Sequence, residues 1–378
     1  MSALHDDVYW MEQAMQEAAK GGWGTHPNPM VGAVIVRDGE ELGRGYHHHA
    51  GMAHAEVEAL KNAAERGFDD VSGATIYVTM EPCNHYGRTP PCSEALIRAK
   101  IARCVIGTRD SNPHVCGGGL ERLREAGIAC TVGVCEQPLL WLNRAFFTAT
   151  RFNRPYITAK WAMTSDGRIA TKTGHSQWVT GTEARRDVHE QRALHDAIMV
   201  GTNTVCADDP QLNVRHIPTV RQPLRVILDR RLRIPLSAQI FDTTHQKTVV
   251  FTTSKTADIT PYIQRGVCVE FVEDTLEKGM DLSQVFSCLV AKYSVTTLYC
   301  EGGAALLGHL RDIDVIDACH IYIAPKLIGG LNALPPIGGD GVEMMDQATT
   351  FEFETPRLFG KDVRLTGYID HTAKPIAP

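Results

Sequence analysis

The chain has 378 residues, enough for two domains or three, and 43% of them are hydrophobic and 22% charged, which is ordinary for a globular protein. This composition excludes an intrinsically disordered chain. The sequence contains no run of about 18 apolar residues, so it predicts no membrane span. The net charge of −6 disfavours a protein that binds duplex nucleic acid. Eleven scattered cysteines, and first residues without a signal-peptide pattern, predict a reducing, cytoplasmic compartment.

Helices and strands alternate in the first part of the chain. A helix that Asp6 or Asp7 can cap comes first, and Gly21-Gly22 ends it. A β-hairpin follows over 31–46. Further helices are predicted from 54 to about 67 and over 93–100, 120–126 and 136–147, and further strands over 74–79 and 104–107. This alternation predicts an α/β sheet with helices on both faces.

The pattern restarts after residues 151–155, whose composition is that of a linker, and we place the domain boundary at residue 148. Strands are predicted over 156–161, 197–200, 224–228, 248–252, 267–271, 296–300 and 320–324, and helices over 182–194, 282–293 and 304–312. The second domain is therefore predicted to be α/β as well. The run His47-His48-His49 is interpreted as a solvated turn rather than a metal site.

Three residues predict a zinc site. His54 opens a helix, Cys83 follows Glu81-Pro82 after a strand, and Cys92 precedes another helix. Taken singly, such residues are more often core residues. Together, one imidazole and two thiolates leave the fourth position of a zinc ion open for a water, whose pKa zinc lowers to about 7. Glu56 is not needed as a ligand and can carry the proton of this water to a substrate nitrogen.

The pattern His-x-Glu followed by Pro-Cys and a second cysteine is the signature of zinc deaminases. The usual signature has two residues between the cysteines, whereas eight separate Cys83 from Cys92. This insert weakens the match to deaminases in general.

The insert and several other segments resemble the family of bifunctional riboflavin-biosynthesis deaminase/reductases. The matching segments, in the family's order along nearly the whole chain, are 26–29, 53–57, 80–92, 162–170, 176–178, 207–212, 301–303 and 322–326. The resemblance implies a cytidine-deaminase-like three-layer α/β/α domain over 1–148, followed by a dihydrofolate-reductase-like α/β domain over 149–378. It also implies deamination of a diaminohydroxyphosphoribosylaminopyrimidine and then NADPH-dependent reduction of the ribosyl group of the product to ribityl.

The resemblance further implies the cofactors Zn²⁺ and NADPH, a small phosphorylated pyrimidine as the substrate, and a homo-oligomer. His54, Cys83 and Cys92 carry over as zinc ligands, Glu56 as the proton shuttle and Asn28 as a contact to the pyrimidine. Substrate contacts in the second domain would be Ser176, Arg192, Leu212, Arg215 and Glu301. Cofactor contacts would be Ala162, Trp178, Thr204, Asp208, Arg230, Gly303, Ala304, Ala305, Leu306, Leu307, Gly308 and His309.

Some of these roles have an argument of their own. Gly302-Gly303 joins a strand to a helix, where backbone N–H groups can approach a phosphate, although such a pair often only makes a turn and no Rossmann fingerprint is present. Arg230 either binds the 2′-phosphate of NADPH or lies in a solvated turn. Lys160, Asp208 and Glu301 line the reductase site by resemblance, and which of them, or solvent, supplies the proton stays open.

The leading hypothesis is a bifunctional enzyme with two active sites. One alternative is a single-activity deaminase with a decayed reductase half, but both halves keep their motifs. A second is a nucleic-acid-editing deaminase, which the net charge of −6 and the 7% of aromatic residues disfavour. A third is a non-catalytic metabolite-binding regulator, which the intact Glu56 argues against.

Overall fold

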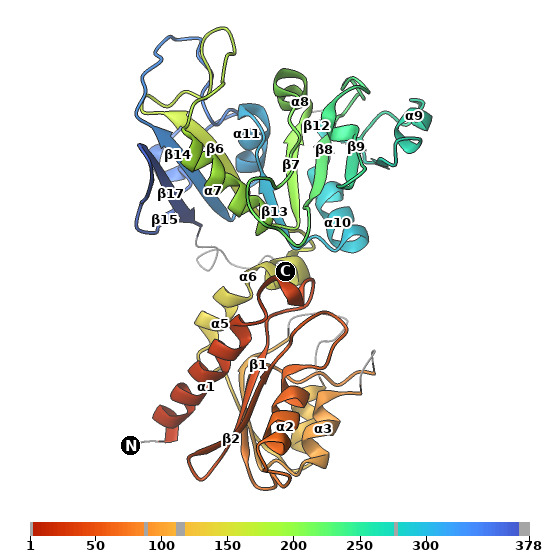
Figure 1. Cartoon of the computed structure of the whole chain (residues 1–378), viewed down its shortest axis with the longest axis vertical. Coiled ribbons are helices and arrows are strands. Elements are labelled where there is room, and N and C mark those ends of the chain that lie inside the picture. The colour runs from red at the N-terminus through yellow and green to blue at the C-terminus, as the bar shows by residue number, and fades with distance from the viewer. Residues whose placement is uncertain (1–2, 87–89, 111–117, 276–278, 370–378) are drawn as a thin grey trace. The chain divides into compact units, whose positions relative to one another are not determined.

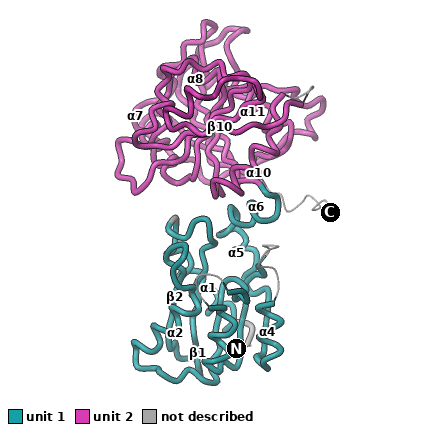
Figure 2. The backbone as a smooth tube through the Cα atoms, turned by 90° about the vertical axis from the view of Figure 1, so that its right-hand side faces the viewer, with its two compact units in different colours: residues 1–153 teal, residues 154–378 magenta. Residues whose placement is uncertain are grey.

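The structure is a computed structural model that describes residues 3–86, 90–110, 118–275 and 279–369 (Figure 1). Residues 87–89 of the predicted segment 80–92 therefore lie outside the described residues. The chain divides into two compact units, residues 1–153 and 154–378 (Figure 2). No helix among the described residues is long and apolar enough to cross a membrane.

Unit 1 is built on a five-stranded sheet. Its order is β2 (Glu40–Tyr46), β1 (Gly32–Arg37), β3 (Thr75–Met80), β4 (Arg103–Thr108) and β5 (Ala129–Val132). Strand β1 is antiparallel to β2 and β3, whereas β3, β4 and β5 are parallel. The loops after the carboxyl ends of β3 and β4 therefore lie at one edge of the sheet, where open α/β sheets place their sites.

Helices cover both faces of this sheet, as the sequence predicts. They are α1 (Ala3–Ala19), α2 (Ala55–Glu65), α3 (Cys92–Arg98), α4 (Gly119–Glu125), α5 (Glu136–Leu142) and α6 (Arg144–Phe152), with a 3₁₀ turn over Gly22–Thr25. Helices α2, α3 and α4 pack on the side chains of Ile35, Ile76 and Ile106. Helices α1 and α5 pack on the opposite face, against Val34 and Val105. The result is a three-layer α/β/α unit.

Three predictions about helices in unit 1 are corrected. Helix α1 begins at Ala3, before the predicted caps. Asp7 is instead buried against the sheet, where it accepts hydrogen bonds from Arg103 and Tyr77. The predicted helix 136–147 is two helices, α5 and α6, that meet at Asn143. Helix α6 runs to Phe152, so the predicted boundary at residue 148 lies inside this helix. The predicted linker over 151–155 overlaps the end of the helix.

Unit 2 is built on a ten-stranded sheet. Its main order is β10 (Cys268–Phe271), β9 (Thr248–Thr252), β8 (Leu224–Leu228), β7 (Ala197–Gly201), β13 (Thr297–Cys300), β6 (Tyr156–Thr164), β14 (Ala318–Ala324), β17 (Asp362–Tyr368) and β15 (Glu352–Phe353), with β16 (Arg357–Phe359) beside β17. The strands from β10 to β14 are parallel, and β17 is antiparallel to β14. A separate ribbon pairs β11 (Asp274–Thr275) with β12 (Gly279–Met280).

Helices cover both faces of this sheet too. The helical elements are α7 (Thr182–Ala193), α8 (Thr202–Asp208), α9 (Thr260–Ile263), α10 (Leu282–Tyr293) and α11 (Ala304–Asp312), with 3₁₀ turns over Gln239–Phe241 and Met345–Gln347. Helices α7 and α8 pack on one face through Val188 and Val205. Helices α10 and α11 pack on the other through Leu289 and Leu307. The carboxyl ends of β7 and β13 lie side by side, because both strands are parallel neighbours.

Candidate functional site

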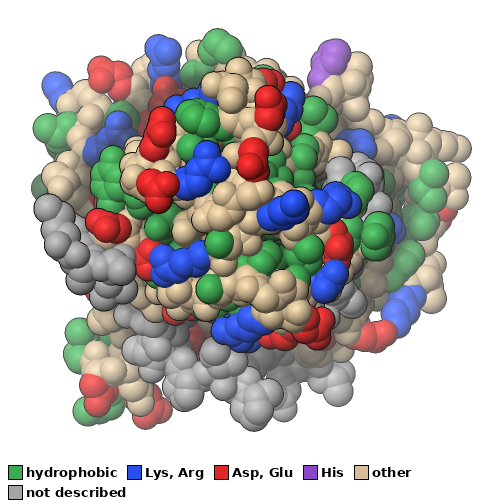
Figure 3. Space-filling model, turned by 90° about the horizontal axis from the view of Figure 1, so that it is seen from below, with side chains coloured by type: hydrophobic (Ala, Val, Ile, Leu, Met, Phe, Trp, Pro, Cys, Tyr) green, Lys and Arg blue, Asp and Glu red, His purple; other side chains and the backbone are tan. Residues whose placement is uncertain are grey.

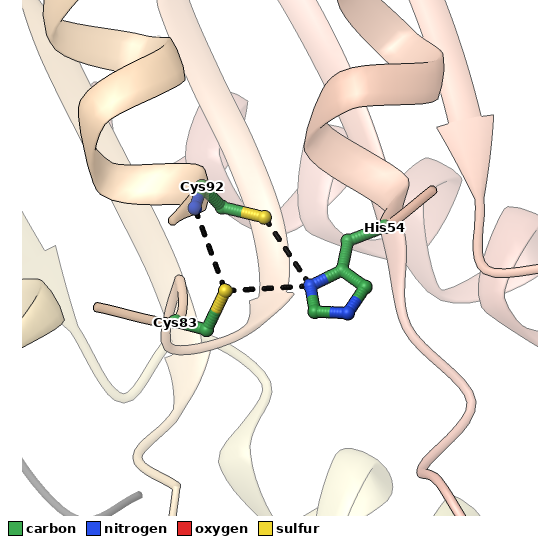
Figure 4. A group of neighbouring side chains, drawn as sticks. All are labelled: His54, Cys83 and Cys92. Carbon is green, nitrogen blue, oxygen red and sulfur yellow. Dashed lines mark hydrogen bonds between the residues drawn. The ribbon is translucent and has the colours of Figure 1, made fainter. Parts of the chain in front are cut away.

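The three predicted zinc ligands come together in unit 1. His54 is the residue before α2, Cys83 lies in the loop after β3, and Cys92 is the first residue of α3. Nδ1 of His54 lies 3.4 Å from Sγ of Cys83 and 3.3 Å from Sγ of Cys92. All three ligand atoms lie within 4.8 Å of one another. Figure 4 shows the three side chains pointing toward one another from three separate elements.

This donor set fits a zinc ion. Tetrahedral zinc, with bonds of about 2.1 Å to nitrogen and 2.3 Å to sulfur, places such atoms about 3.6 Å apart. Hydrogen bonds with Cys92 and His54 lower the pKa of the Cys83 thiol to about 4. The hydrogen bond with Cys83, together with burial, raises the pKa of Cys92. The site thus already favours one thiolate before a cation is considered.

Glu56 lies beside this donor set, in the first turn of α2. Its side chain is almost fully buried, with 3% of the residue exposed. Burial, and then the charge of Cys83, raise its pKa to about 7. A carboxyl group that ionises near neutral pH can both accept and donate a proton at that pH.

Asn28 is held by His47, which the sequence predicts to lie in a solvated turn. Nδ2 of Asn28 donates to Nε2 of His47 over 3.2 Å, and Nδ1 of His47 lies 3.1 Å from the carbonyl oxygen of Ala53. Because a carbonyl can only accept, Nδ1 carries the proton and Nε2 is the acceptor. The solvated-turn prediction is wrong for His47, which is 3% exposed. The sequence of β2 does not signal this burial, because Leu42 and Gly43 are both buried and the strand does not alternate strictly.

Glu81 is a second residue near the site with a role that the sequence does not predict. It follows β3, is buried, and accepts the backbone N–H of Leu120 over 3.1 Å. Its other carboxylate oxygen lies 3.4 Å from Nε of Arg109. These contacts tie the loop that carries Cys83 to α4. A charged residue directly between a buried strand and Pro-Cys was the available signal.

Unit 2 contains a cluster of charges after β13. Arg192 on α7 donates from Nε and Nη2 to the two carboxylate oxygens of Glu301, over 2.5 and 2.9 Å. Nζ of Lys160, on β6, lies 3.8 Å from the same carboxylate. Burial lowers the pKa of Lys160. Burial alone would raise the pKa of Glu301, but Arg192 and Lys160 lower it to about 2.

Other predicted residues surround this cluster. Asp208, at the end of α8, accepts from Oγ of Ser176 over 3.3 Å, and its charge acts on the pKa of Lys160. Arg215 is exposed and lies close enough to Arg192 for that charge to lower its pKa, although burial contributes more. Ala162 lies two residues after Lys160 on β6.

The start of α11 fits a dinucleotide phosphate. Gly303 precedes the first helical residue, Ala304, and its backbone is extended. A Cβ atom added to Gly303 would lie 3.6 Å from Oγ1 of Thr204, so the starts of α8 and α11 are close together. The missing side chain leaves the backbone N–H groups at the start of α11 open to an anion. Ala305 and Leu306 lie in the same turn of the helix.

The structure does not bring every predicted side chain to these sites. Leu212 is 2% exposed and belongs to the core, as do Leu307 and Gly308. Trp178 is 59% exposed and stacks with Arg185 at 4.5 Å. Arg230 forms an ion pair with Asp274. His309 lies in the last turn of α11, away from its first residues.

Comparisons with known proteins cover both units. A family described as "RibD C-terminal domain" matches residues 155–365. A family described as "Cytidine and deoxycytidylate deaminase zinc-binding region" matches residues 4–108. The riboflavin biosynthesis protein RibD of Aquifex aeolicus is 42% identical over 358 residues, which cover 94% of this chain and 97% of the relative. The Escherichia coli protein of the same name is 39% identical and covers 95% and 98%.

Solved structures of proteins from the same family have the same fold along nearly the whole chain. Acinetobacter baumannii RibD superposes with a TM-score of 0.83 at 38% identity, covering 97% of this chain and all of that one, 100%. A diaminohydroxyphosphoribosylaminopyrimidine deaminase/5-amino-6-(5-phosphoribosylamino)uracil reductase of Thermotoga maritima has a TM-score of 0.80 at 32% identity, with the same coverage of 97% and 100%. The chain therefore belongs to the family of bifunctional riboflavin-biosynthesis proteins, with a cytidine-deaminase-like domain and a dihydrofolate-reductase-like domain, and is a zinc-dependent deaminase and NADPH-dependent reductase.

Proposed function

We propose that residues 1–153 deaminate a diaminohydroxyphosphoribosylaminopyrimidine and that residues 154–378 reduce the ribosyl group of the resulting 5-amino-6-(5-phosphoribosylamino)uracil. The observation that carries the first half is the meeting of His54, Cys83 and Cys92 at one point beside the buried Glu56. The charge cluster of Lys160, Arg192 and Glu301 supports the second half.

In the deaminase, His54, Cys83 and Cys92 would hold a zinc ion, which when bound would supply an activated water. Glu56 would carry a proton from the attacking water to the amino nitrogen of the pyrimidine, which leaves as ammonia while the ring carbon becomes a carbonyl. The amide oxygen of Asn28 faces the pyrimidine, because its Nδ2 is already bound to His47. Deep burial of Glu56 keeps bulk water from competing for this proton.

When bound, NADPH would supply the hydride that reduces C1 of the sugar. Lys160 donates the proton that the ring oxygen needs as the sugar ring opens. Glu301 is a poor donor, because its pKa of about 2 keeps it ionised, and its charge instead helps Lys160 to hold its proton. Arg192 fixes the position of Glu301. Asp208 and Ser176 form the polar wall beside them.

The remaining assignments follow from charge and backbone geometry. Arg215, exposed and near Arg192, binds the phosphate of the substrate, and the main chain of Leu212 lies beside it. Gly303 to Leu306 and Thr204 receive the cofactor's diphosphate, while Ala162 flanks the nicotinamide. Trp178 would have to leave its stack on Arg185 to reach the same ring. Arg230 binds the 2′-phosphate after exchanging its partner Asp274 for it.

The same proposal covers partners and compartment. A small pyrimidine rather than a nucleic acid is favoured by the net charge of −6 and by the mixture of acidic and basic side chains on the face in Figure 3. A homo-oligomer is part of the proposal on the family resemblance alone. The ten described cysteines are free thiols, which favours the cytoplasm.

Product analysis by mass spectrometry tests both halves. Zinc-loaded protein is incubated with the diaminopyrimidine phosphate, once without and once with NADPH. We expect the deaminated ribosyl compound without the cofactor and the ribityl compound with it. Glu56→Gln should form neither product yet retain zinc, and Lys160→Met should stop at the deaminated ribosyl compound.

Two exposed residues provide matched controls. Glu65→Gln lies on the same helix as Glu56, and Lys361→Met lies in unit 2. Both variants should form both products. Release of ammonia at the wild-type rate by Glu56→Gln, or of the ribityl product by Lys160→Met, would remove that residue from the proposed mechanism.

A further inference from the structure

The eight residues between the two cysteines of the zinc site are a feature that the proposed reaction leaves unexplained. The usual zinc-deaminase signature has only two residues between its cysteines, whereas residues 84–91 separate Cys83 from Cys92. The entropic cost of bringing two points of a chain together grows with the number of residues between them. A longer insert by itself therefore defines the separation of the two thiolates less well. The ends of the insert need contacts of their own to bring the ligand atoms within 4.8 Å of one another.

Backbone groups make the first two of these contacts. The backbone N–H of Ser93, the residue after Cys92, donates to the carbonyl oxygen of Cys83 over 3.2 Å. The backbone N–H of Cys92 donates to Sγ of Cys83 over 3.4 Å, and this bond is drawn in Figure 4. Both N–H groups belong to the first turn of α3, where such groups have no partner within the helix. They are therefore available to the loop that carries Cys83.

A side-chain hydrogen bond joins the residues that follow the two cysteines. Oγ of Ser93 donates to Oδ1 of Asn84 over 2.7 Å. Ser93 is completely buried, with 0% of the residue exposed, whereas Asn84 is exposed. A buried hydroxyl group that loses its partner costs free energy, because water cannot take the partner's place. The bond between Asn84 and Ser93 is therefore kept, and it ties the neighbour of one zinc ligand to the neighbour of the other.

The start of α4 packs directly on the first end of the insert. A Cβ atom added to Gly118 would lie 3.0 Å from Nδ2 of Asn84. A Cβ atom added to Gly119 would lie 1.8 Å from the carbonyl oxygen of Pro82. Only glycine leaves room for so close an approach of two backbones. The loop with Cys83 is thus packed against α4, while Cys92 belongs to α3, and the bond between Asn84 and Ser93 connects the two.

We propose that Asn84 and Ser93 are positioning residues of the zinc site. Their hydrogen bond fixes the separation of Cys83 and Cys92 in spite of the long insert, and so strengthens the binding of the ion. Neither residue supplies a ligand, and each acts through the cysteine beside it. The inference rests on the proposed function only through the zinc ion, because its test measures binding of the ion and not deamination.

The dissociation constant of Zn²⁺ tests this role, measured on the full-length protein by competition with a chromophoric chelator. Asn84→Ala and Ser93→Ala each remove the bond, and each should weaken zinc binding roughly tenfold, as the loss of a residue that orients metal ligands commonly does. Both changes remove the same bond, so the double variant should bind no more weakly than the weaker single one. Asn84→Asp keeps the acceptor and should bind zinc at least as tightly as the wild type. A general loss of stability would not give this rescue.

Tyr86→Ala is the matched control, because Tyr86 is 83% exposed and lies in the same insert. It should bind zinc as the wild type does. Asn84→Ala alters an exposed side chain and keeps the test decisive if Ser93→Ala fails to fold. The proposal is overturned if Asn84→Ala binds zinc as tightly as the wild type, if the two losses multiply in the double variant, or if Tyr86→Ala weakens binding equally.

Failure of the proposed function gives a different result. Wild-type protein that binds zinc but releases no ammonia would overturn the proposed deamination alone, and the comparison of zinc affinities would stand. Wild-type protein that binds no zinc would overturn both the deamination and the role of Asn84 and Ser93.

Discussion

At the scale of single residues, Glu301 balances the positive charges of the reductase centre. It is shared by two cations, Arg192 at 2.5 Å and Lys160 at 3.8 Å. Burial by itself lowers the pKa of Lys160 and raises the pKa of Glu301, which favours the neutral form of each group. The charge of each group acts against this shift in the pKa of the other. The pKa of Lys160 therefore depends on a carboxylate that follows a different strand.

This dependence predicts how Glu301→Gln changes the pH profile of the reductase. Lys160 must be protonated to act as an acid, so the rate falls as the pH rises through its pKa. Loss of the carboxylate removes an interaction that raises this pKa, and the falling limb should move to lower pH by at least about one unit. The limb is measured by NADPH oxidation over a range of alkaline pH, with the exposed Glu352→Gln as the control. An unmoved limb would exclude Lys160 as the acid.

Residue-level prediction from the sequence succeeds where spacing and chemistry are enough. His54, Cys83 and Cys92 meet because strand–loop–helix segments of a parallel sheet bring such residues to one edge. His47 and Glu81 were missed because their importance depends on burial and on partners far along the chain, Asn28 and Leu120. No local pattern encodes those contacts.

At the scale of elements, hydrophobic patterning located most strands and helices. Strands β8 and β9 and helices α10 and α11 have the predicted bounds, because their buried faces are apolar. Strand β17 was missed because its inward positions hold polar residues, Asp362, Arg364 and Thr366. Helix α8 was missed because it is short and largely polar. Where the interior is polar, hydrophobic periodicity carries no signal.

Asn143 gives an element-scale prediction in unit 1. It separates α5 from α6, is 4% exposed, and forms two hydrogen bonds with the backbone of Met30, at 2.8 and 2.9 Å. Asn143→Ala leaves the partly buried N–H and carbonyl of Met30 without this partner, so the free energy of unfolding should fall by about 2 kcal/mol. Urea unfolding checks this value. The exposed Gln137→Ala on α5 is the control and should change it little; equal stability of the two variants would contradict the argument.

At the scale of the whole molecule, the two units have separate cores. Two hydrophobic clusters lie within residues 1–153 and two within 154–378. All strands of each sheet also come from one unit. We therefore expect each unit to unfold in a cooperative transition of its own.

Removal of zinc should affect one of these transitions only. A ligand stabilises the state that binds it, and the donor set His54, Cys83 and Cys92 joins three elements of unit 1. Chelation should lower the unfolding temperature of unit 1 by several degrees and leave that of unit 2 unchanged. Differential scanning calorimetry with and without chelator measures both, and NADPH provides the converse control by raising only the transition of unit 2. A fall in both transitions on chelation would show that the units do not unfold independently.

Two buried histidines make the stability of unit 2 sensitive to mild acid. Burial lowers the pKa of His189 to about 4, assisted by Arg192, and that of His320 to about 3. Unfolded histidine titrates near pH 6.5. Between about pH 6.5 and 4 the unfolded chain therefore binds protons that the folded chain does not, so stability falls as the pH falls, by up to about 1.4 kcal/mol per unit for each histidine. His320→Gln, whose amide can still pair with the hydroxyl of Tyr299, should make this slope clearly shallower between pH 6.5 and 5 in urea unfolding followed in unit 2.

The exposed His175→Gln should keep the wild-type slope, because its imidazole is solvated in both states. A wild-type slope in His320→Gln would mean that His320 is protonated in the folded protein.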